Sequence, residues 1–401
     1  MRRPALRRVA VAELAAFILV VGVGVPASIA APVPSARAEV VTAAQTATAD
    51  AVPAFPGFGS AAIGAVELPG VLAQAGSQRA RPIASITKVV TALVVLQRKP
   101  LTTGEDGPTI TFSNADVAIL SDVLAKQGSW QRVESGWRTS ERQAIETMLI
   151  PSANNYAESL AIWAYGSVPA YLVAARAFLR THHLDDTRLV DSNGLSDGDR
   201  STPADLVDLG RLALADPVIA ATVDKESARE PNIGEVDNTN ELLGTHGVNG
   251  IKTGTTQDAG ACLLFSAKVQ VGARTVQLVG VILGASTHPV LDARVPALLR
   301  SVQRGLHDVP LTRTDTAYAT YRTRWGGVAK AVPQRATSVL VWGRAMVQRS
   351  ADVRSITGGT KGERVGTVTY RVQDRAVVVP LVLDRDVLAA PVWWRITHPL
   401  R

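Results

Sequence analysis

Several features that fix structure or chemistry in other proteins are scarce in this sequence of 401 residues. There is one cysteine, Cys262, so no disulfide can form within the chain, and its apolar neighbours indicate a buried packing residue. The sequence contains six histidines, and the zinc-hydrolase motif His-Glu-x-x-His is absent. His182 and His183 are adjacent and would point in different directions on a helix, which argues against a shared metal. The sequence therefore predicts no disulfide framework, no metal and no cofactor.

The start of the chain has the pattern of an export signal. Four arginines lie among its first eight residues, and an uninterrupted apolar run, Leu14–Val25, follows them. Residues 36–38, Ala-Arg-Ala, then offer a small-x-small cleavage site, and 27–31 is a second candidate. The apolar run is short for a membrane span, which needs about 20 residues, so we expect residues 1–38 to be a signal peptide. An uncleaved anchor is the alternative if the weaker segment from Val9 is included.

Basic residues exceed acidic ones only at the two ends of the chain. Residues 1–38 contain five Arg and one Glu, residues 39–305 contain 22 Lys and Arg against 27 Asp and Glu, and residues 306–401 contain 15 against 7. A basic tail on an exported protein indicates contact with anionic lipid head groups or anionic wall polymers rather than nucleic acid. A basic surface that is merely solvated has the same composition, so the sequence leaves both interpretations open.

Hydrophobic periodicity and turn residues divide the rest of the chain into three parts. Residues 39–55 lack helical punctuation and are expected to be a linker. Residues 56–305 combine strand and helix patterns, which indicates an α+β domain, and residues 306–401 contain short β-like runs, which indicates a small all-β domain. The expected helices are 84–98, 114–125, 140–150, 154–165, 169–180, 203–215 and 289–305. The expected strands are 61–67, 70–75, 259–269, 275–284, 316–325, 336–342, 365–372, 376–383 and 391–396.

The first residues with chemical potential lie at the start of the predicted helix 84–98. Ser85 and Lys88 are three residues apart, and positions i and i+3 share one face of a helix, so the hydroxyl and the amine can meet. Ser85 falls in the first turn, where unpaired N–H groups and the helix dipole favour negative charge. The residues after Lys88 are almost all apolar. We therefore expect Lys88 to be buried, and burial lowers the pKa of an amine towards that of a usable base.

A second polar pair lies in the predicted loop between the helices 140–150 and 154–165. Ser152 offers a hydroxyl and Asn154 an amide, two residues apart in the sequence Pro-Ser-Ala-Asn. A hydroxyl and an amide in such a loop are suited to relaying a proton and to holding a peptide carbonyl.

A third polar segment, Lys252-Thr253-Gly254-Thr255, comes just before the two predicted strands 259–269 and 275–284. On an edge strand, Lys252 and Thr253 are expected to point to opposite faces, while Gly254 lets a substrate backbone come close. Thr253 and Thr255 are then on one side, where they can bind a carboxylate.

In this order, Ser-x-x-Lys, Ser-x-Asn and Lys-Thr-Gly are the motifs of the serine penicillin-recognising enzymes. Over about residues 56–305 the chain resembles the D-alanyl-D-alanine carboxypeptidases, the low-molecular-mass penicillin-binding proteins. The resemblance implies a β-lactamase/transpeptidase-like domain, with an antiparallel sheet flanked by helices and a helical subdomain, followed by the β domain. It also implies acyl transfer at the D-Ala-D-Ala end of a peptidoglycan stem peptide, and covalent inhibition by β-lactams.

The same resemblance assigns catalytic roles to the first two motifs. Ser85 would be the nucleophile and Lys88 its general base. Ser152 would pass a proton to the leaving amine, and Asn154 would hold the substrate amide.

The third motif would bind the substrate and stabilise charge. Lys252, Thr253 and Thr255 would bind the terminal carboxylate, with Gly254 beside the substrate backbone. The backbone N–H groups of Ser85 and Thr255 would form the oxyanion hole.

Two other functions remain as alternatives. A class A-like β-lactamase would need a glutamate-borne deacylating water, and Glu226, Glu230 and Glu235 lie in the right interval, but no Glu-x-x-Leu-Asn sequence occurs there. A non-catalytic penicillin-binding wall sensor would keep the pocket without releasing D-alanine. Each motif alone would fit a helix cap, a turn or a solvated strand, whereas three motifs in order favour an active site.

The predicted location is extracytoplasmic, at the outer face of the cytoplasmic membrane or in the cell wall. The sequence leaves open the balance of carboxypeptidase and transpeptidase activity, the stem-peptide preference, the removal of the leader and the mode of membrane attachment. It also leaves open the oligomeric state and the role of the C-terminal β domain.

Overall fold

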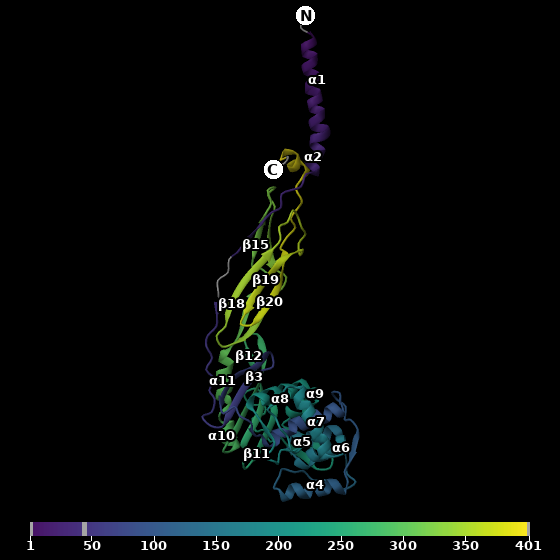
Figure 1. The fold of residues 1–401 in the computed structure, drawn as a ribbon, viewed down its shortest axis with the longest axis vertical. Helices are drawn as coiled ribbons and strands as arrows, with labels where there is room; N and C mark the ends of the chain where they lie inside the picture. Colours follow the sequence, from purple (N-terminus) through teal and green to yellow (C-terminus); the bar gives the residue numbers. More distant parts are fainter. Residues whose placement is uncertain (1–2, 42–45, 399–401) are drawn as a thin grey trace. The chain divides into compact units, whose positions relative to one another are not determined.

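The computed structural model describes residues 3–41 and 46–398, and it divides into two compact units (Figure 1). One unit is Asp50–His307 and the other combines Met1–Ala49 with Asp308–Arg401. Each unit is described by itself below. The domain limits at 55/56 and 305/306 remain our proposal, and part of the expected linker, residues 42–45, lies outside the described residues.

The unit Asp50–His307 is built on a five-stranded antiparallel sheet with the order β11-β12-β13-β3-β4. Its long strands alternate between two buried faces, so that Leu264 packs with the helices α3 and α8 while the neighbouring Leu263 and Phe265 point the other way. Figure 1 shows α8 on one side of the sheet and α11 on the other. The strands are β3 (Ser60–Ala65), β4 (Leu68–Gly76), β11 (Val248–Thr256), β12 (Gly260–Val271) and β13 (Arg274–Ala285).

The helices of this unit start at polar caps that the sequence displays. Ser140 and Gln143 form a capping box at the start of α5, and Thr202 caps α8, where Pro203 takes the first helical position. Helix α3 is buried at every residue from Thr87 to Leu96, so it is a central helix. The helices are α3 (Thr87–Arg98), α4 (Asn114–Ala125), α5 (Glu141–Leu149), α6 (Asn154–Tyr165), α7 (Val168–Thr181), α8 (Pro203–Ala215), α9 (Pro217–Val223), α10 (His288–Asp292) and α11 (Val295–Gly305).

Short elements connect these layers, and two details differ from the sequence-based expectation. The expected strands 61–67 and 70–75 place the hairpin turn around residues 68–70, but the turn between β3 and β4 lies at residues 66–67. The expected helix 289–305 is divided into α10 and α11. The residues between α8 and β11 also contain a helix and a hairpin that the polar sequence did not indicate. The short elements are η2 (Ala84–Ile86), β5 (Arg81–Pro82), β6 (Thr109–Thr111), β7 (Arg138–Ser140), β8 (Arg200–Ser201), β9 (Ser227–Glu230) and β10 (Gly234–Asp237).

Glu141, the first residue of α5, should make the stability of this unit depend on pH. Its side chain is fully buried, and neither carboxyl oxygen has a hydrogen-bond partner among the described residues. Burial raises the pKa of Glu141 to about 7, although Lys99 and Arg142 oppose the shift. The folded state therefore binds a proton that the unfolded state releases above its ordinary pKa of about 4.5, so stability falls as the pH rises from about 4.5 to about 7.

We expect Glu141→Gln to make the stability of the protein less dependent on pH. The change in the free energy of unfolding that the substitution causes should be about 1–2 kcal/mol more favourable at pH 8 than at pH 5. Thermal or urea unfolding at both pH values measures the difference. The exposed Glu134→Gln is the matched control and should leave the pH slope as in the wild type. If the free energy of unfolding of Glu141→Gln depends on pH as strongly as that of the wild type, the Glu141 carboxyl is not the source of this pH dependence.

The other unit has a seven-stranded sheet with the order β1-β15-β16-β20-β19-β18-β2, and a separate pair, β14 with β17. Tyr318, Tyr321 and Tyr370 lie in its core, and the hydroxyls of Tyr318 and Tyr370 are 2.6 Å apart. The strands are β1 (Ala38–Val40), β2 (Thr46–Ala47), β14 (Leu306–Thr312), β15 (Ala319–Arg322), β16 (Val328–Pro333), β17 (Thr337–Trp342), β18 (Met346–Val353), β19 (Arg364–Val372) and β20 (Arg375–Leu383).

Two expectations for this unit need correction. The apolar run 391–396 is not a strand but the helix α12 (Val392–Thr397), with Pro391 at its N-cap, because a short apolar run does not by itself distinguish strand from helix. Ala38–Val40, placed at the junction of leader and linker, is the strand β1 and pairs with β15. Part of the expected linker therefore belongs to the sheet.

The N-terminal residues form one continuous helical segment, made of α1 (Arg3–Leu19), the π-helical turn η1 (Val20–Gly24) and α2 (Val25–Ala30). Arg8–Ala30 is long and apolar enough to cross a membrane, and none of it is buried inside the protein. A signal sequence passes the same test of length and composition.

Candidate active site

The structure brings together the hydroxyl and the amine of the first motif. Ser85 lies in the 3-10 turn η2, and Lys88 lies in the first turn of α3, so the side chains share one face. Lys88 Nζ is 2.8 Å from Ser85 Oγ. The same nitrogen donates to the main-chain oxygen of Asn193 at 2.8 Å and to Oδ1 of Asn154. The amine is thus held by three oxygens from three segments of the chain.

Lys88 lies in an environment that favours a neutral amine. Its side chain is fully buried, and burial is the main cause that lowers the pKa of Lys88 well below its ordinary value. The charge of Lys252 lowers the pKa further, while the carboxylates of Asp191 and Asp199 act in the opposite direction. A proton acceptor is therefore positioned beside the Ser85 hydroxyl.

Asn193 belongs to a turn that Asp191 organises. The carboxylate of Asp191 accepts hydrogen bonds from three backbone N–H groups, those of Asn193 (2.8 Å), Gly194 (2.6 Å) and Ser196 (2.8 Å). Asp199 accepts in turn from the backbone of Asp191 at 3.2 Å, and its pKa is raised to about 8 by burial and by the neighbouring Asp191. This fixed turn presents the carbonyl of Asn193 to Lys88.

The peptide that joins Ala84 to Ser85 is enclosed by two glycines. A Cβ on Gly194, whose φ is +81°, would lie 2.0 Å from the carbonyl oxygen of Ala84. A Cβ on Gly254, in the edge strand β11, would lie 3.0 Å from the backbone nitrogen of Ser85. Ala84 itself has a left-handed backbone with φ of 48°, which alanine rarely adopts. The surroundings therefore hold the turn that contains Ser85 in one conformation.

The second motif lies between α5 and α6, as the sequence indicates. Ser152 is buried and has a left-handed backbone with φ of 67°, and the structure shows no hydrogen bond from its hydroxyl to any described residue. The side chain of Asn155 binds both polar backbone atoms of Gln131, with Nδ2 donating at 2.8 Å and Oδ1 accepting at 3.1 Å. Asn154 uses its Oδ1 for Lys88, which leaves its amide N–H groups for another acceptor.

The third motif lies on β11, which is an edge strand of the sheet. Lys252 and Thr253 were expected on opposite faces, but Lys252 Nζ reaches to 3.4 Å from Thr253 Oγ1 and to 3.3 Å from Thr239 Oγ1. The two threonine hydroxyls are 2.5 Å apart. Burial lowers the pKa of Lys252 to about 7. The result is a compact cluster of one ammonium and two hydroxyls.

Thr255 takes a different partner from Thr253, although both lie on one strand. Its Oγ1 is 2.8 Å from His288 Nε2, at the start of α10. Burial lowers the pKa of His288, and the charge of Lys252 acts in the same direction, while Glu241 opposes them. Thr253 and Thr255 therefore have different hydrogen-bond partners, Thr239 and His288.

The sequence-based interpretation missed four polar residues that surround these motifs: Asp191, Asn193, Thr239 and His288. The sequence Asp-Ser-Asn-Gly at 191–194 shows a turn, and turns of this type place a backbone carbonyl in a fixed direction. Thr239 and His288 gave no local signal, because β11 meets them only after the chain has folded.

The turn at 191–198 also contains Gly-Leu-Ser-Asp-Gly, the spacing of a nucleophile elbow, at 194–198. An elbow needs a strand before the serine and a helix after it, and residues 194–198 lie in a loop without either. Ser196 Oγ accepts a hydrogen bond from Gly198 N at 3.2 Å. Ser196 is therefore a turn residue, whereas Ser85 has the amine of Lys88 within 2.8 Å of its hydroxyl.

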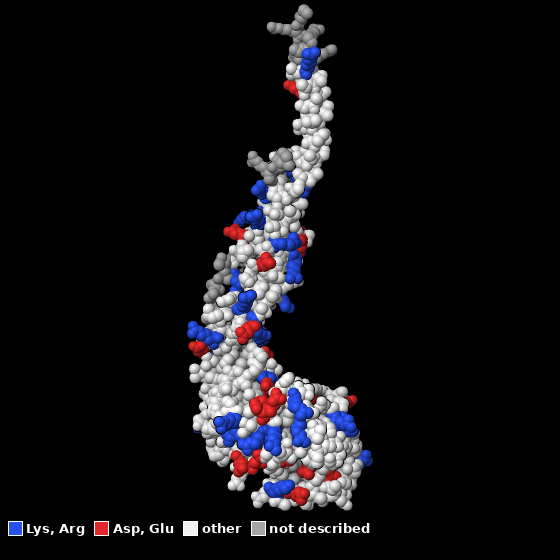
Figure 2. All heavy atoms as spheres, viewed as in Figure 1, with Lys and Arg blue, Asp and Glu red and all other residues white. Residues whose placement is uncertain are grey.

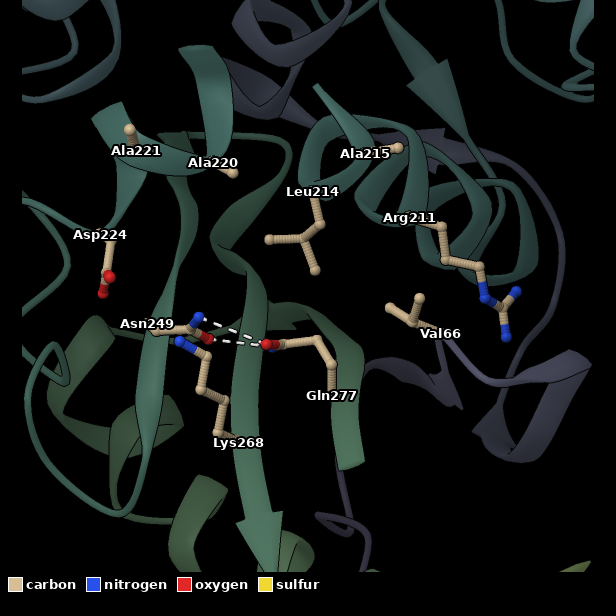
Figure 3. A pocket seen from close by; sticks show the side chains of 10 residues that line it. All are labelled: Val66, Arg211, Leu214, Ala215, Ala220, Ala221, Asp224, Asn249, Lys268 and Gln277. Atoms are coloured by element: carbon tan, nitrogen blue, oxygen red, sulfur yellow. Dashed lines mark hydrogen bonds between the residues drawn. The ribbon is translucent and has the colours of Figure 1, made fainter. Parts of the chain in front are cut away.

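A hollow of about 400 Å³ lies elsewhere in the same unit (Figure 3). Asn249 and Gln277 are hydrogen-bonded to each other in it, with Gln277 Nε2 donating to Asn249 Oδ1 at 3.0 Å. Its lining contains none of the residues of the three motifs. In the part of the chain that is described, no group of three or more His, Cys, Asp or Glu side chains is placed to hold a metal ion.

An antiparallel sheet with a Ser-x-x-Lys helix, a Ser-x-Asn loop and a Lys-Thr-Gly edge strand defines the class of serine penicillin-recognising enzymes. The family model described as D-alanyl-D-alanine carboxypeptidase, of peptidase family S11, matches residues 61–287. The chain belongs to this family.

Similar proteins are named for two different activities, endopeptidase and carboxypeptidase. A D-alanyl-D-alanine endopeptidase of Pseudomonas aeruginosa is 33% identical over 192 residues, 46% of this chain and 58% of that protein. The D-alanyl-D-alanine carboxypeptidase DacC of Escherichia coli is 26% identical over 259 residues, 64% of each chain. The chain thus spans about six tenths of the length of these curated relatives.

Solved structures have the same fold. The DD-transpeptidase of Streptomyces K15 has a TM-score of 0.54 at 22% identity, over 63% of this chain and 97% of its own. Penicillin binding protein 5 of Haemophilus influenzae has a TM-score of 0.59 at 18% identity, over 83% and 99%. The likeness to penicillin binding protein 5 extends beyond the unit Asp50–His307. The predicted fold, a transpeptidase-like domain followed by a β domain, is therefore confirmed.

Proposed function

We propose that this chain is a serine D,D-peptidase that forms an acyl-enzyme on Ser85 at the D-Ala-D-Ala end of a peptidoglycan stem peptide and releases the terminal D-alanine. The observation that carries the proposal is the arrangement of oxygens around Lys88 Nζ. A neutral amine has two N–H bonds and one lone pair. Asn154 Oδ1 and the Asn193 carbonyl can only accept, so they take the two N–H bonds. The lone pair then faces the Ser85 hydroxyl.

In this mechanism Lys88 removes the proton as Ser85 Oγ attacks the carbonyl carbon of the penultimate D-alanine. The negative charge that develops on the carbonyl oxygen would be bound by the backbone N–H groups of Ser85 and Thr255. Gly254 supports this assignment, because only a residue without a side chain lets β11 approach Ser85 N so closely. One such donor typically contributes about 2.7–4 kcal/mol to lowering the barrier.

Collapse of the tetrahedral intermediate breaks the C–N bond, and the leaving amine of D-alanine takes a proton through Ser152. Ser152 is suited to this relay because the residue is buried and its hydroxyl has no hydrogen-bond partner among the described residues. The free N–H groups of Asn154 would hold a substrate carbonyl. Water then attacks the ester on Ser85, which returns the free hydroxyl and releases the shortened peptide.

The cluster of Lys252, Thr253 and Thr239 would bind the terminal carboxylate of the substrate. It offers one ammonium and two hydroxyls within 3.4 Å of one another, and a bound carboxylate would offset the cost of burying the charge. Thr255 and His288 form the adjacent polar pair. A penicillin carboxylate would use the same cluster, which accounts for covalent inhibition by β-lactams in this proposal.

D-alanine release from a soluble pentapeptide ending in D-Ala-D-Ala tests the proposal. Release by the wild type and none by Ser85→Ala would support a carboxypeptidase. Cleavage of a cross-linked peptide dimer without release from the pentapeptide would instead assign the endopeptidase activity, which the name of the Pseudomonas aeruginosa relative favours. A covalent penicillin adduct with neither activity would indicate a sensor, and rapid turnover of penicillin would indicate a β-lactamase.

The two buried lysines should give the acylation rate a bell-shaped pH dependence. The rate should rise as Lys88 loses its proton, because only the neutral amine is a base. It should fall above about pH 7, where Lys252 loses the charge that binds the carboxylate. The rate constant for labelling by a fluorescent penicillin, from about pH 5 to about pH 10, measures both limbs.

Lys252→Arg is the variant that separates the two limbs, because arginine stays protonated throughout this range. We expect the alkaline limb to move out of the measured range while the acid limb is kept. An alkaline limb that stays near pH 7 in this variant would show that Lys252 is not the group responsible.

A further inference from the structure

The segment that follows the N-terminal helix is built into the sheet of the C-terminal β unit. Ala36 is buried in the core of this unit and forms a bridge with Ile356, with N–H···O distances of 2.7 Å and 3.2 Å in the two directions. Ala38 pairs with Tyr321 at the start of β1. Cleavage after Ala38, the site expected from the sequence, would remove Ala36 and its bridge from the mature protein.

A second contact joins the N-terminal helix to the other end of the chain. Helix α12 packs against α2, and Arg395 Nη1 donates to the carbonyl oxygen of Ile29 at 2.6 Å. Ile29 lies in the last turn of α2, where carbonyls lack a helical partner and a cation is favoured. Trp394 holds α12 in place, because its ring meets that of Trp325 edge-on with 5.5 Å between the ring centroids.

These two contacts give the residues before position 39 a structural role that a removed signal peptide does not have. The bridge lies at residue 36 and the helix cap at residue 29, so each cleavage site predicted from the sequence would destroy at least one of them. A signal peptide that is removed has no need to complete the fold of the mature protein.

Apolar side chains of the same region face outward next to the end of the apolar helix. Trp393 is 63% exposed, and other exposed apolar residues lie close to it in the sequence. Soluble proteins seldom expose several large apolar side chains together. Figure 2 shows most of the N-terminal helical segment as an uncharged surface. Glu13 is the only acidic residue in the sequence of this segment, residues 3–30. The other exposed apolar residues are Leu388 (77%), Val392 (56%) and Ile396 (39%).

We propose that residues 8–30 are retained as a membrane anchor and that α12 lies at the outer surface of the lipid bilayer around the point where this anchor leaves it. The length and composition of Arg8–Ala30 fit a membrane span. The arginines before it stay on the cytoplasmic side, so the folded units are outside. Trp393 then lies at the depth where tryptophan is enriched in membrane proteins, and Val392, Ile396 and Leu388 face the lipid.

The first test is the mass of the mature chain, purified from the membranes of an expressing bacterium. Retention predicts the mass of the full sequence, with or without the first methionine, and recovery in the membrane fraction after alkaline carbonate washing. A mature chain that begins near residue 31 or 39 would overturn the proposal. Neither readout depends on peptidase activity.

The second test locates α12 in the full-length protein in lipid vesicles. Trp393→Cys and Val378→Cys would each be labelled with an environment-sensitive fluorophore, since the native Cys262 is buried. Val378 is a matched control because it is an exposed apolar residue of β20 in the same unit. Nitroxide-labelled lipids should quench the label at 393 and leave the label at 378 unaffected. Equal, weak quenching at both positions would overturn the placement of α12.

Discussion

Lys88→Met is expected to slow the acylation of Ser85 by about 10³-fold, the typical contribution of a general base. Methionine keeps the unbranched shape of the side chain and removes the nitrogen that three oxygens surround. The proton of Ser85 then has no acceptor in position, and Asn154 Oδ1 loses its donor. The rate constant for labelling by a fluorescent penicillin measures the loss, with circular dichroism to show that the variant folds.

Lys99→Met is the matched control for this variant, since Lys99 caps the other end of the same helix and is partly exposed. It should leave the labelling rate within about twofold of the wild type. If Lys88→Met folds and is labelled at nearly the rate of the wild type, Lys88 is not the base, and the proposed mechanism is wrong.

Gly194→Ala is expected to be the most damaging single methyl group in the chain's active site. The added Cβ would lie 2.0 Å from the Ala84 carbonyl oxygen, so the peptide that carries Ser85 must move. A displacement of about 1 Å in a reacting group can cost about 10²-fold in rate. We expect a loss of this size in penicillin labelling, together with a loss of about 1–3 kcal/mol in stability from the clash.

Gly136→Ala separates the clash from the backbone effect. Gly136 has a φ of +88°, close to that of Gly194, but a Cβ there would meet nothing within 4 Å. It should therefore show only the cost of a left-handed alanine, about 1–2 kcal/mol, with normal labelling. Equal labelling rates in the two variants would show that Gly194 does not position the nucleophile.

The features that the sequence predicted well are those that short-range geometry determines. The contact of Ser85 with Lys88 follows from helical spacing, and the start of α8 follows from Thr202 and Pro203. The two long strands before α10, β12 and β13, follow from their apolar runs, and only their place beside β11 and β3 in the sheet had to come from the fold. The proposed roles of the site residues rest on these local motifs.

The features that the sequence did not reveal depend on contacts between distant segments. Thr239 is polar and ordinary in its own segment, and it becomes part of the lysine cluster only because β11 passes beside it. The run 391–396 forms a helix rather than a strand where Trp394 packs on Trp325 and α12 packs on α2. Ala38–Val40 resembles the end of a leader until β15 offers it a partner. Local patterns carry no information on such pairings.

The mass of the intact protein after treatment with penicillin, followed by peptide mapping, shows whether Ser85 forms the acyl-enzyme. We expect one added penicillin per chain, located in the tryptic peptide 80–88, which contains Ser85, and no addition to Ser85→Ala. The adduct should persist for minutes or longer, because the proposed peptidase does not turn over penicillin rapidly. An adduct on any other residue, or a folded wild-type protein that takes up no penicillin, would show that Ser85 is not the nucleophile.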